Sequence, residues 1–590
     1  MKSKNNISKY IFLLGILVFS SCNDFLDKYP LDQVSERTFW KTAADLDAYI
    51  VGRYEWLPNG MLWKEDAKSD NMIAGTHAGG FSKYMNGEMI TPTDAGSGSW
   101  SWSDIRTINI FLDNYHRCEE PWDKYKHTVG EACFLKAMKY RNLVTLFGDV
   151  PWYSNTLAME DEAEMMKPQT PRAVVVDSIM ALIDRSYELL KKKSEAGNNR
   201  LNKETALIYK SRVALFEATW AKYHNGTPSA SGVDANKYFQ KVIDAYNEFK
   251  TLTGGLNNVI YTTGNPETDY YNLFNRFDYK DVNEVMLSRK YSQALGVTHN
   301  WNRMCALSYE NTGYALDLVQ AYLDKDGNTI DVTNRTIFPS TGSAYISELA
   351  EKLDPRFKQS CFIPGDLINS VTPGWIDSLW TIPALFGAQY EEAPSGFHPK
   401  KGHNVLGPIQ NNTDPLIAGI CFRTAEIILN YVEAYVELNG SFPDLSDNLD
   451  LLRKRVNMPP LTGNMPTITK EWPNYGYAIS NELAIIRQER RIELAAEGFR
   501  QNDWRRWRAH ALFNGKRQKG YRFNKDDFGS KNVSNVQVDE NGYVDYYRKG
   551  LPDGYKFRPE QDYLYPIPLG DLVRNPNLKQ NPGWSIPSGK

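Results

Sequence analysis

The stretch EACFLKAMKYRNLVTLFGDVPW (residues 131–152) decides the fold of this chain. Its apolar residues recur at alternating spacings of four and three, which places them on one face of an α-helix: Cys133, Ala137, Tyr140, Val144 and Phe147. Gly148 and Pro151 then stop the helix. The stretch therefore predicts a long helix whose apolar face packs against other helices.

Further amphipathic stretches lie in both halves of the sequence. Thr170 and Pro171 predict an N-cap and a first helical position. Apolar stripes at helical spacing cover residues 176–190, 206–220, 238–249 and 425–435, and helix resumes after Ser480. Consecutive helices with short loops predict stacked antiparallel hairpins. Their spacing is of the order of tetratricopeptide units of about 34 residues, although the consensus of that repeat is not visible. We expect an all-α fold of degenerate tetratricopeptide-like repeats.

Two irregular stretches interrupt this pattern. From about residue 251 to 420, Gly, Pro, Asn and aromatic residues dominate, and from 515 to 560 the turns Asn541-Gly542 and Asp553-Gly554 predict minor β-hairpins. Loops of this length in a compact protein are usually functional. We therefore expect a loop-built binding face. The last prolines predict an extended strap without helix: Pro566, Pro568, Pro576 and Pro582.

The N-terminus predicts export. Three lysines precede an apolar or small run from residue 10 to 19, followed by Ser20, Ser21 and Cys22, which is the order of a secretory signal. The run is shorter than the roughly 20 residues that a bilayer core requires. The small pair before Cys22 resembles a bacterial lipobox, so we expect residues 1–21 to be a signal peptide and Cys22 to be the lipidation site. Ordinary cleavage nearby, with Cys22 unmodified, is the alternative.

Composition limits the possible partners. The chain has 590 residues, is 42% hydrophobic and 24% charged, and carries a formal net charge of -3. It can bury a large core, and nucleic acid is a poor partner because no basic bias exists. The aromatic content of 13%, with 35 Tyr and 15 Trp, exceeds what a core alone suggests.

Sequence motifs for catalysis are missing. The chain has no HExxH pair, no phosphate-binding glycine loop and no GxSxG nucleophile elbow. Asp and Glu are plentiful, so the two carboxylates of a glycosidase, which approach each other only in space, stay possible. We expect a binding protein rather than an enzyme, without a metal or cofactor.

Aromatic residues with polar neighbours are the candidates for ligand binding. A sugar ring has an apolar C–H face and a rim of hydroxyls, so its site needs aromatic platforms flanked by hydrogen-bonding side chains. Two regions have this mixture, and they predict the following ligand-binding residues: Asp70, Asn71, Trp100, Trp102, Trp301 and Arg303. Trp375 and Trp380 extend the second region. Burial in the core is the competing interpretation for each aromatic residue.

The segment from 489 to 507 predicts a helix with surface ion pairs, because opposite charges stand three residues apart on it. The expected pairs are Arg490 with Glu493, Glu497 with Arg500, and Asp503 with Arg506.

Four segments, in order along nearly the whole chain, resemble hallmarks of the SusD/RagB family: residues 131–152, 421–438, 489–507 and 562–584. The segments beginning at Cys22 and Thr38 also look like the mature N-terminus of that family. One departure is local. The family often places a glutamate after the PIP turn, where this chain has Gly570 and Asp571.

The resemblance implies both an organisation and a role. Residues 22–250 would form a SusD-like N-terminal helical-repeat region, and residues 251–590 the SusD/RagB C-terminal region, packed together as one globular unit. The protein would be an outer-membrane lipoprotein at the cell surface that captures oligosaccharides and delivers them to a SusC-like TonB-dependent transporter. The alternatives are a peptide-capturing RagB-like variant, a surface glycoside hydrolase and a structural helical-repeat adaptor.

Overall fold

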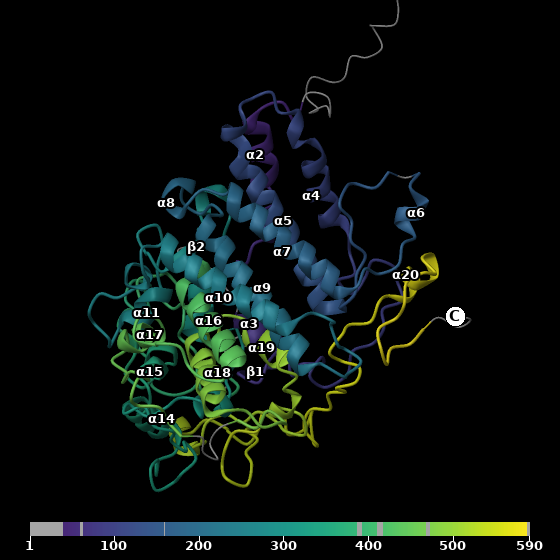
Figure 1. Cartoon of the computed structure of the whole chain (residues 1–590). Helices are drawn as coiled ribbons and strands as arrows, with labels where there is room; N and C mark the ends of the chain where they lie inside the picture. The colour runs from purple at the N-terminus through teal and green to yellow at the C-terminus, as the bar shows by residue number, and fades with distance from the viewer. Residues whose placement is uncertain are drawn as a thin grey trace, which may run out of the picture.

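The computed structural model describes residues 39–59, 63–158, 160–308, 310–385, 392–409, 417–467 and 473–586. The predicted signal peptide, residues 1–21, and Cys22 lie outside these ranges. The described chain is mainly helical, with long irregular connections in its second half (Figure 1). The expected all-α fold with tetratricopeptide-like repeats is confirmed. No helix within the described ranges is long and apolar enough to span a bilayer.

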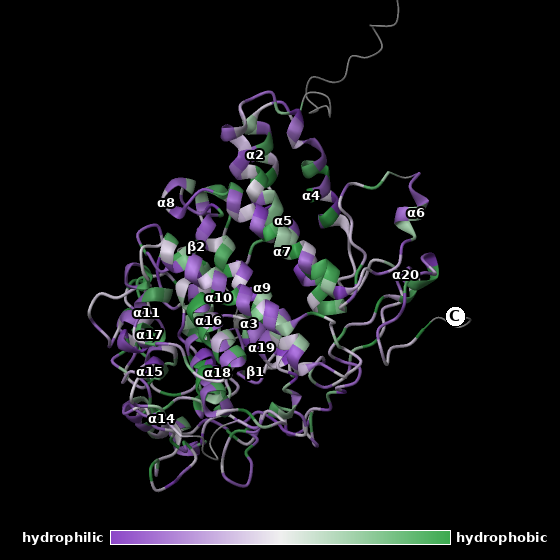
Figure 2. Ribbon diagram, in the orientation of Figure 1, coloured by the Kyte–Doolittle hydropathy of each residue, from purple (hydrophilic) through white to green (hydrophobic). Residues whose placement is uncertain are grey.

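The long helices stack as hairpins. In chain order they are α2 (Ala43–Val51), α4 (Ser103–Asn114), α5 (Trp122–Phe147), α7 (Arg172–Leu189), α9 (Lys203–Tyr223), α10 (Ala235–Leu252), α16 (Thr424–Asn439) and α18 (Asn481–Glu493). Each of α5, α7, α9 and α10 packs on the next, α2 and α4 cover α5, and α16 packs on α9, α10 and α18. Helices from both halves of the chain thus share one stack, and hydrophobic and hydrophilic residues are mixed along their ribbons (Figure 2).

Shorter helices interrupt the irregular regions: α3 (Trp63–Asp66), α6 (Glu162–Met165), α8 (Lys193–Ala196), α11 (Asp269–Phe274), α12 (Trp301–Leu307), α13 (Leu316–Val319), α14 (Gly342–Lys352), α15 (Arg356–Ser360), α17 (Leu449–Lys454), α19 (Arg500–Arg506) and α20 (Leu569–Arg574). Helix α20 corrects one expectation, because the C-terminal strap was predicted to contain no helix. Pro568 is its N-cap, a position where a missing backbone N–H costs nothing.

The start of α7 also differs from the prediction. Its N-cap is Pro171 and not Thr170. Thr170 instead exchanges two backbone hydrogen bonds with Val150, at 3.1 and 3.3 Å. The carboxylate of Asp149 accepts the backbone N–H of Arg172 at 2.7 Å, so the turn after α5 supplies the capping group.

The minor β-structure is confirmed, but most of it is not local. The strands are β1 (Met72–Ala74), β2 (Val285–Arg289), β3 (Thr312–Tyr314), β4 (Leu367–Asn369), β5 (Ser378–Leu379) and β6 (Gly419–Arg423). They form three antiparallel pairs, β1–β3, β2–β6 and β4–β5. Because the first two pairs join segments far apart in the sequence, no hairpin signal could have predicted them.

The predicted helix over 489–507 is two helices. Helix α18 ends at Glu493 and α19 begins at Arg500, and between them Ala496 (φ 60°) and Gly498 (φ 79°) adopt left-handed backbone. The break frees the carbonyl of Glu493, which accepts hydrogen bonds from Tyr270 and from Arg423. The backbone carbonyl at the break therefore finds its hydrogen-bond donors in other segments of the chain.

The charges of this segment are largely buried, so the prediction of a surface location is wrong for all three pairs, and two of the three pairs do not form. Asp503 and Arg506 do pair, at 3.0 Å. Glu493 and Glu497 instead bind bases from elsewhere in the chain. Arg490 pairs with Asp503 at 2.9 Å. Helices α18 and α19 therefore turn their charged side chains toward the interior of the protein.

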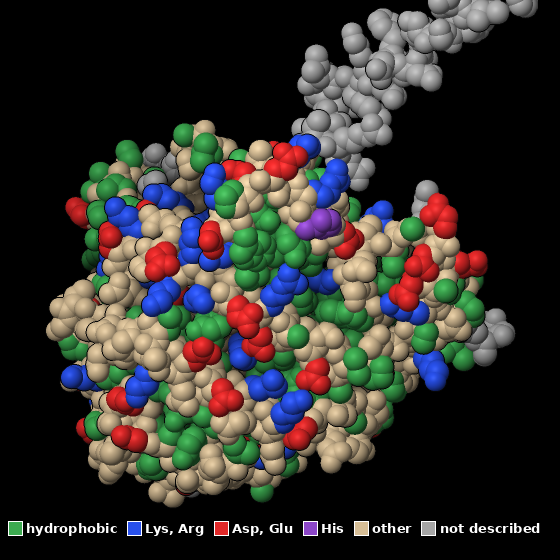
Figure 3. All heavy atoms as spheres, turned by 45° about the horizontal axis from the view of Figure 1, so that its top comes forward, with side chains coloured by type: hydrophobic (Ala, Val, Ile, Leu, Met, Phe, Trp, Pro, Cys, Tyr) green, Lys and Arg blue, Asp and Glu red, His purple; other side chains and the backbone are tan. Residues whose placement is uncertain are grey.

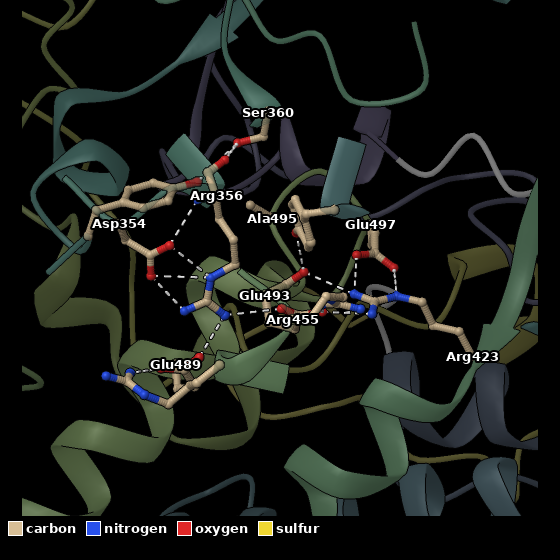
Figure 4. Close-up of polar contacts among 12 residues, drawn as sticks. Asp354, Arg356, Ser360, Arg423, Arg455, Glu489, Glu493, Ala495 and Glu497 are labelled. Carbon is tan, nitrogen blue, oxygen red and sulfur yellow. Dashed lines mark hydrogen bonds and ion pairs between the residues drawn. The ribbon is translucent and has the colours of Figure 1, made fainter. Parts of the chain in front are cut away.

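Glu493 is the centre of a buried ion network (Figure 4). Its carboxylate contacts Arg455 at 2.5 Å, Arg423 at 2.8 Å and Arg356 at 3.0 Å. Burial alone would raise the pKa of Glu493, but the three guanidinium groups hold it well below its ordinary value. The carboxylate therefore stays ionised in the interior.

The network extends in both directions from Glu493. Arg356 also binds Asp354 and Glu489, at 2.7 and 2.6 Å. Arg423 also binds Glu497 at 2.6 Å, and Glu497 binds Lys401 at the same distance. Acids and bases thus alternate through this network, so that each charge named here has an opposite charge beside it.

Replacing Glu493 by Gln should destabilise the protein by about 3–5 kcal/mol, because three buried guanidinium groups would lose a shared counter-charge. Denaturant unfolding followed by circular dichroism measures the change. Glu351→Gln is the control, since Glu351 is exposed on α14, and it should change the unfolding free energy by less than about 0.5 kcal/mol. Equal effects of the two substitutions would contradict the central role of Glu493.

Glu433 of α16 predicts a pH dependence of stability. Burial would raise its pKa, but Arg506, which binds it at 2.6 Å, lowers the pKa to about 2 from an ordinary 4.5. The unfolded chain therefore binds the proton more readily. The stabilisation is complete above about pH 4.5 and is lost as the pH falls toward 2. In Glu433→Gln, the unfolding free energy should fall less steeply between pH 4.5 and 2.5 than in the wild type; identical slopes would refute this.

Candidate functional site

A cleft beside α4 contains one of the predicted residues, Trp102. The cleft has a volume of about 320 Å³ and lies between the start of α4 and the segment 153–157, with Met165 of α6 also lining it. Its lining residues are Trp102, Ser103, Ile105, Arg106, Asn109, Tyr153, Asn155, Thr156, Leu157 and Met165.

One face of α4 builds the cleft wall. Asn109 Nδ2 donates to the carbonyls of Tyr153 (3.2 Å) and Asn155 (2.8 Å). Arg106 donates to the carbonyl of Leu157 at 2.9 Å, and Asp113 accepts the backbone N–H of Thr156 at 2.7 Å. These α4 residues and Trp102 stand four, three and four apart, so they share one helix face. Sequence analysis missed this polar stripe, although its spacing was visible.

Two aromatic rings form a corner in the cleft. The rings of Trp102 and Tyr153 are 5.3 Å apart and nearly perpendicular, at 88°. Trp102 is only partly buried, and burial raises the pKa of Tyr153 to about 12, so Tyr153 stays a neutral phenol. Such a corner offers an apolar surface to a flat, partly apolar ligand.

Two oxygen atoms of the cleft residues have no hydrogen-bond partner in the part of the chain that the structure describes. They are Asn109 Oδ1 and Thr156 Oγ1, and both are buried. Asn109 is 1% exposed. A buried polar atom without a partner costs about 1–3 kcal/mol. The cleft therefore combines an aromatic corner with unused acceptor atoms, which suits a ligand that carries hydroxyl donors.

The charges around the cleft are uneven. Figure 3 shows acidic side chains gathered over α6, where Asp161, Glu162 and Glu164 are exposed. Lys167 binds Glu164 at 2.7 Å and holds its ammonium 4.4 Å from the ring of Tyr153. An acidic rim repels anionic ligands and leaves neutral ones unaffected.

Trp100 lies behind this cleft, not in it. It is 2% exposed, and its ring packs against Phe147 at 4.9 Å and Trp102 at 5.5 Å. The prediction of direct ligand contact is therefore corrected: Trp100 supports Trp102 from the core.

Asp70 and Asn71 are also corrected, because both are buried among arginines, at 2% and 1% exposure. Asp70 binds Arg500 at 2.7 Å and Arg491 at 3.1 Å. Burial opposes ionisation, but these arginines lower the pKa of Asp70 to about 2. Asn71 accepts a hydrogen bond from Arg491 at 2.7 Å. The pair holds α18 and α19 in place.

The second predicted region is largely internal. Trp301 is 7% exposed and packs against Gly402, where a Cβ atom would lie 2.5 Å from the indole nitrogen. Arg303 donates to the carbonyl of Ile409 at 2.8 Å. Trp301 therefore supports the loop around Gly402 and does not face a ligand, while Arg303 is partly exposed. Trp375, between β4 and β5, is 37% exposed. Only Trp102 of the six predicted residues lines the α4 cleft.

Metal-binding geometry is not found in the described ranges: no three or more His, Cys, Asp or Glu side chains gather there to hold an ion.

Comparison with known proteins gives family matches over most of the chain. The model of the SusD family matches residues 278–584, and a model described as starch-binding associating with outer membrane matches residues 24–215. A SusD-like protein of Formosa agariphila is 23% identical over 98% of this chain and 99% of its own length.

Solved structures share the fold. A SusD-like protein of Bacteroides fragilis has a TM-score of 0.69 at 20% identity, covering 94% of this chain and all of the other. A SusD-like carbohydrate-binding protein of the same species also has a TM-score of 0.69 at 20% identity, covering 92% of this chain and 100% of the other. A laminarin-binding SusD-like protein has a TM-score of 0.51 at 17% identity, with 92% and 100% covered. Since the SusD model alone matches more than half of the residues, this chain belongs to the SusD family.

Proposed function

We propose that this protein captures oligosaccharides in the α4 cleft and delivers them to a SusC-like TonB-dependent transporter of the outer membrane. One observation carries the choice of site: the Trp102–Tyr153 corner stands beside the unpartnered oxygens of Asn109 and Thr156. Family membership and the carbohydrate-binding and laminarin-binding relatives support a sugar as the ligand. The match to a family associated with the outer membrane supports the location.

A sugar ring would use both kinds of surface in the cleft. Its C–H face would pack against Trp102, and its hydroxyls would donate to Asn109 Oδ1 and Thr156 Oγ1 after a small movement of residues 153–157 uncovers these buried oxygens. An aromatic contact contributes about 0.5–1.5 kcal/mol beyond the apolar area that it buries, and a net hydrogen bond contributes about 0.5–1.5 kcal/mol, whereas association costs at least about 4 kcal/mol. Affinity is therefore expected between about millimolar and micromolar. Weak binding permits transfer to the transporter.

The lining of the cleft favours binding over hydrolysis. A glycosidase needs two carboxyl groups about 5–9.5 Å apart across the scissile bond. Neither Asp nor Glu is among the described lining residues. We therefore infer capture without turnover; product release from labelled oligosaccharides would instead support a surface glycoside hydrolase. A peptide-capturing variant would bind peptide pools and not glycans.

Trp102→Ala should lower the affinity for a neutral oligosaccharide at least about tenfold, because the larger half of the aromatic corner is lost. Isothermal titration calorimetry with a panel of polysaccharide fragments measures the affinity. Trp122→Ala is the matched control, since Trp122 is exposed at the start of α5 and does not line the cleft. The affinity of this control variant for the oligosaccharide should equal that of the wild type.

A second variant separates binding from folding. Thr156→Val removes a hydroxyl that bonds to none of the described residues, so the melting temperature should not fall. The affinity should fall about 2- to 10-fold, the value of one hydrogen bond. Unchanged affinity in both Trp102→Ala and Thr156→Val would refute the α4 cleft as the glycan site.

The proposed anchor and transporter are tested in cells. Cys22→Ala should move the protein from the membrane fraction to the soluble fraction without changing its affinity for glycans, because acylation tethers the chain and takes no part in the cleft. Affinity purification of the wild type from membranes should recover a TonB-dependent barrel. Recovery of no such transporter would refute the delivery step.

A further inference from the structure

A second cleft lies across the helical stack from the first. Its volume is about 580 Å³, and its walls come from the connection 192–204 around α8, the end of α10 with residues 252–259, and residues 279–288 including β2. In Figure 1, α8 and β2 stand on the opposite side of the stack from α4 and α6. The two clefts share no lining residue.

Ammonium and amide groups dominate this second cleft. Its lining includes five asparagines and four basic residues, Lys192, Lys193, Arg200 and Lys280. Glu204 is the one carboxylate among the described lining residues. It accepts the backbone N–H of Lys193 at 2.8 Å, and burial raises its pKa above the ordinary value. Basic groups therefore outnumber acidic ones.

Several lining residues are fixed in place and form rigid walls. Asn202 caps α9 and donates to the carbonyl of Met286 at 2.8 Å. Arg200 binds Asp47 at 2.7 Å and Glu131 at 2.6 Å, so its charge is balanced outside the cleft.

Other lining residues are uncommitted. Within the described part of the chain, Lys192 Nζ and the side-chain amides of Asn198 and Asn283 have no hydrogen-bond or ion-pair partner. Lys280 has only a loose contact with Asp281, at 3.9 Å. Lys192 and Lys280 are exposed. The cleft thus presents more uncommitted donors than acceptors, and the exposed ammonium groups of Lys192 and Lys280 add positive charge.

We propose that this cleft is a second saccharide site, which binds the carboxylate or sulfate groups of an acidic oligosaccharide. Ammonium and amide donors form charge-assisted hydrogen bonds with anionic oxygens. The α4 cleft has the opposite character, with free acceptors and an acidic rim. The assignment of a saccharide rests on the proposed function; the anion preference rests on the lining alone.

The test measures binding of three probes by calorimetry: a neutral laminari-oligosaccharide, an oligogalacturonate and a sulfated galactan oligosaccharide. The two acidic probes separate carboxylate from sulfate recognition. The variant Lys192→Gln/Lys280→Gln should lower the affinity for the preferred acidic probe at least about tenfold and leave neutral binding unchanged. Wild-type affinity for that probe should also fall as salt rises from 50 to 500 mM.

Two control variants isolate the cleft from total charge. Lys83→Gln/Lys549→Gln removes the same charge from exposed lysines outside the cleft and should keep wild-type affinity for the acidic probe. Lys192→Arg/Lys280→Arg keeps the positive charge, so this variant should retain most of the affinity for the acidic probe. Wild-type protein that binds neither acidic probe, or equal losses in the two Gln variants, would overturn the proposal.

Trp102→Ala distinguishes this inference from the proposed function. It should weaken binding of the neutral probe and leave binding of the acidic probe unchanged. Lysine-dependent acidic binding without any neutral binding would support the second site and refute the α4 cleft. If the neutral probe binds in a Trp102-dependent manner and neither acidic probe binds, the α4 cleft is supported and the second site is refuted.

Discussion

The buried ion network around Glu493 holds together segments that are separate in the second half of this chain. Helix α18 ends before α19 begins, and this break turns the charged side chains of residues 489–507 inward. There Arg356, Arg423 and Arg455 converge on the carboxylate of Glu493 (Figure 4). Those arginines come from separate parts of the second half of the chain. A buried charge without a partner costs several kcal/mol, so the segments that carry these groups fold correctly only together. A separate buried pair, Asp70 with Arg500 of α19, connects the first half of the chain to this segment.

The ion network lies in the interior, so the outer faces of the helical stack are available for binding sites. The polar stripe of α4 fixes the segment after α5 and so places Tyr153 against Trp102. The connection before α9 is fixed by Asn202 in the same manner. Each cleft is therefore built from a helix and a loop that the helix holds, which positions polar groups more accurately than a free loop would.

The two clefts differ in the hydrogen bonds that they leave unused. The α4 cleft has unpartnered acceptors, Asn109 Oδ1 and Thr156 Oγ1, which match the hydroxyl donors of a neutral sugar. The second cleft has unused donors, with Lys192 and Lys280 exposed, which match anionic oxygens.

The sequence by itself determined most of the long helices, because apolar spacing and helix stops act within a few turns of the chain, and its motifs carried the resemblance to the family. It also placed Trp102 among the candidates. Only the tertiary structure decided which polar residues are free to bind a ligand. Asp70, Asn71 and the charges of 489–507 read as surface groups, yet the structure buries them against arginines that are distant in the sequence. Trp100 and Trp102 stand two residues apart in the same composition, and packing against Phe147 buries one of them. Burial is a property of the whole fold, so local pattern could not separate a supporting side chain from a binding one.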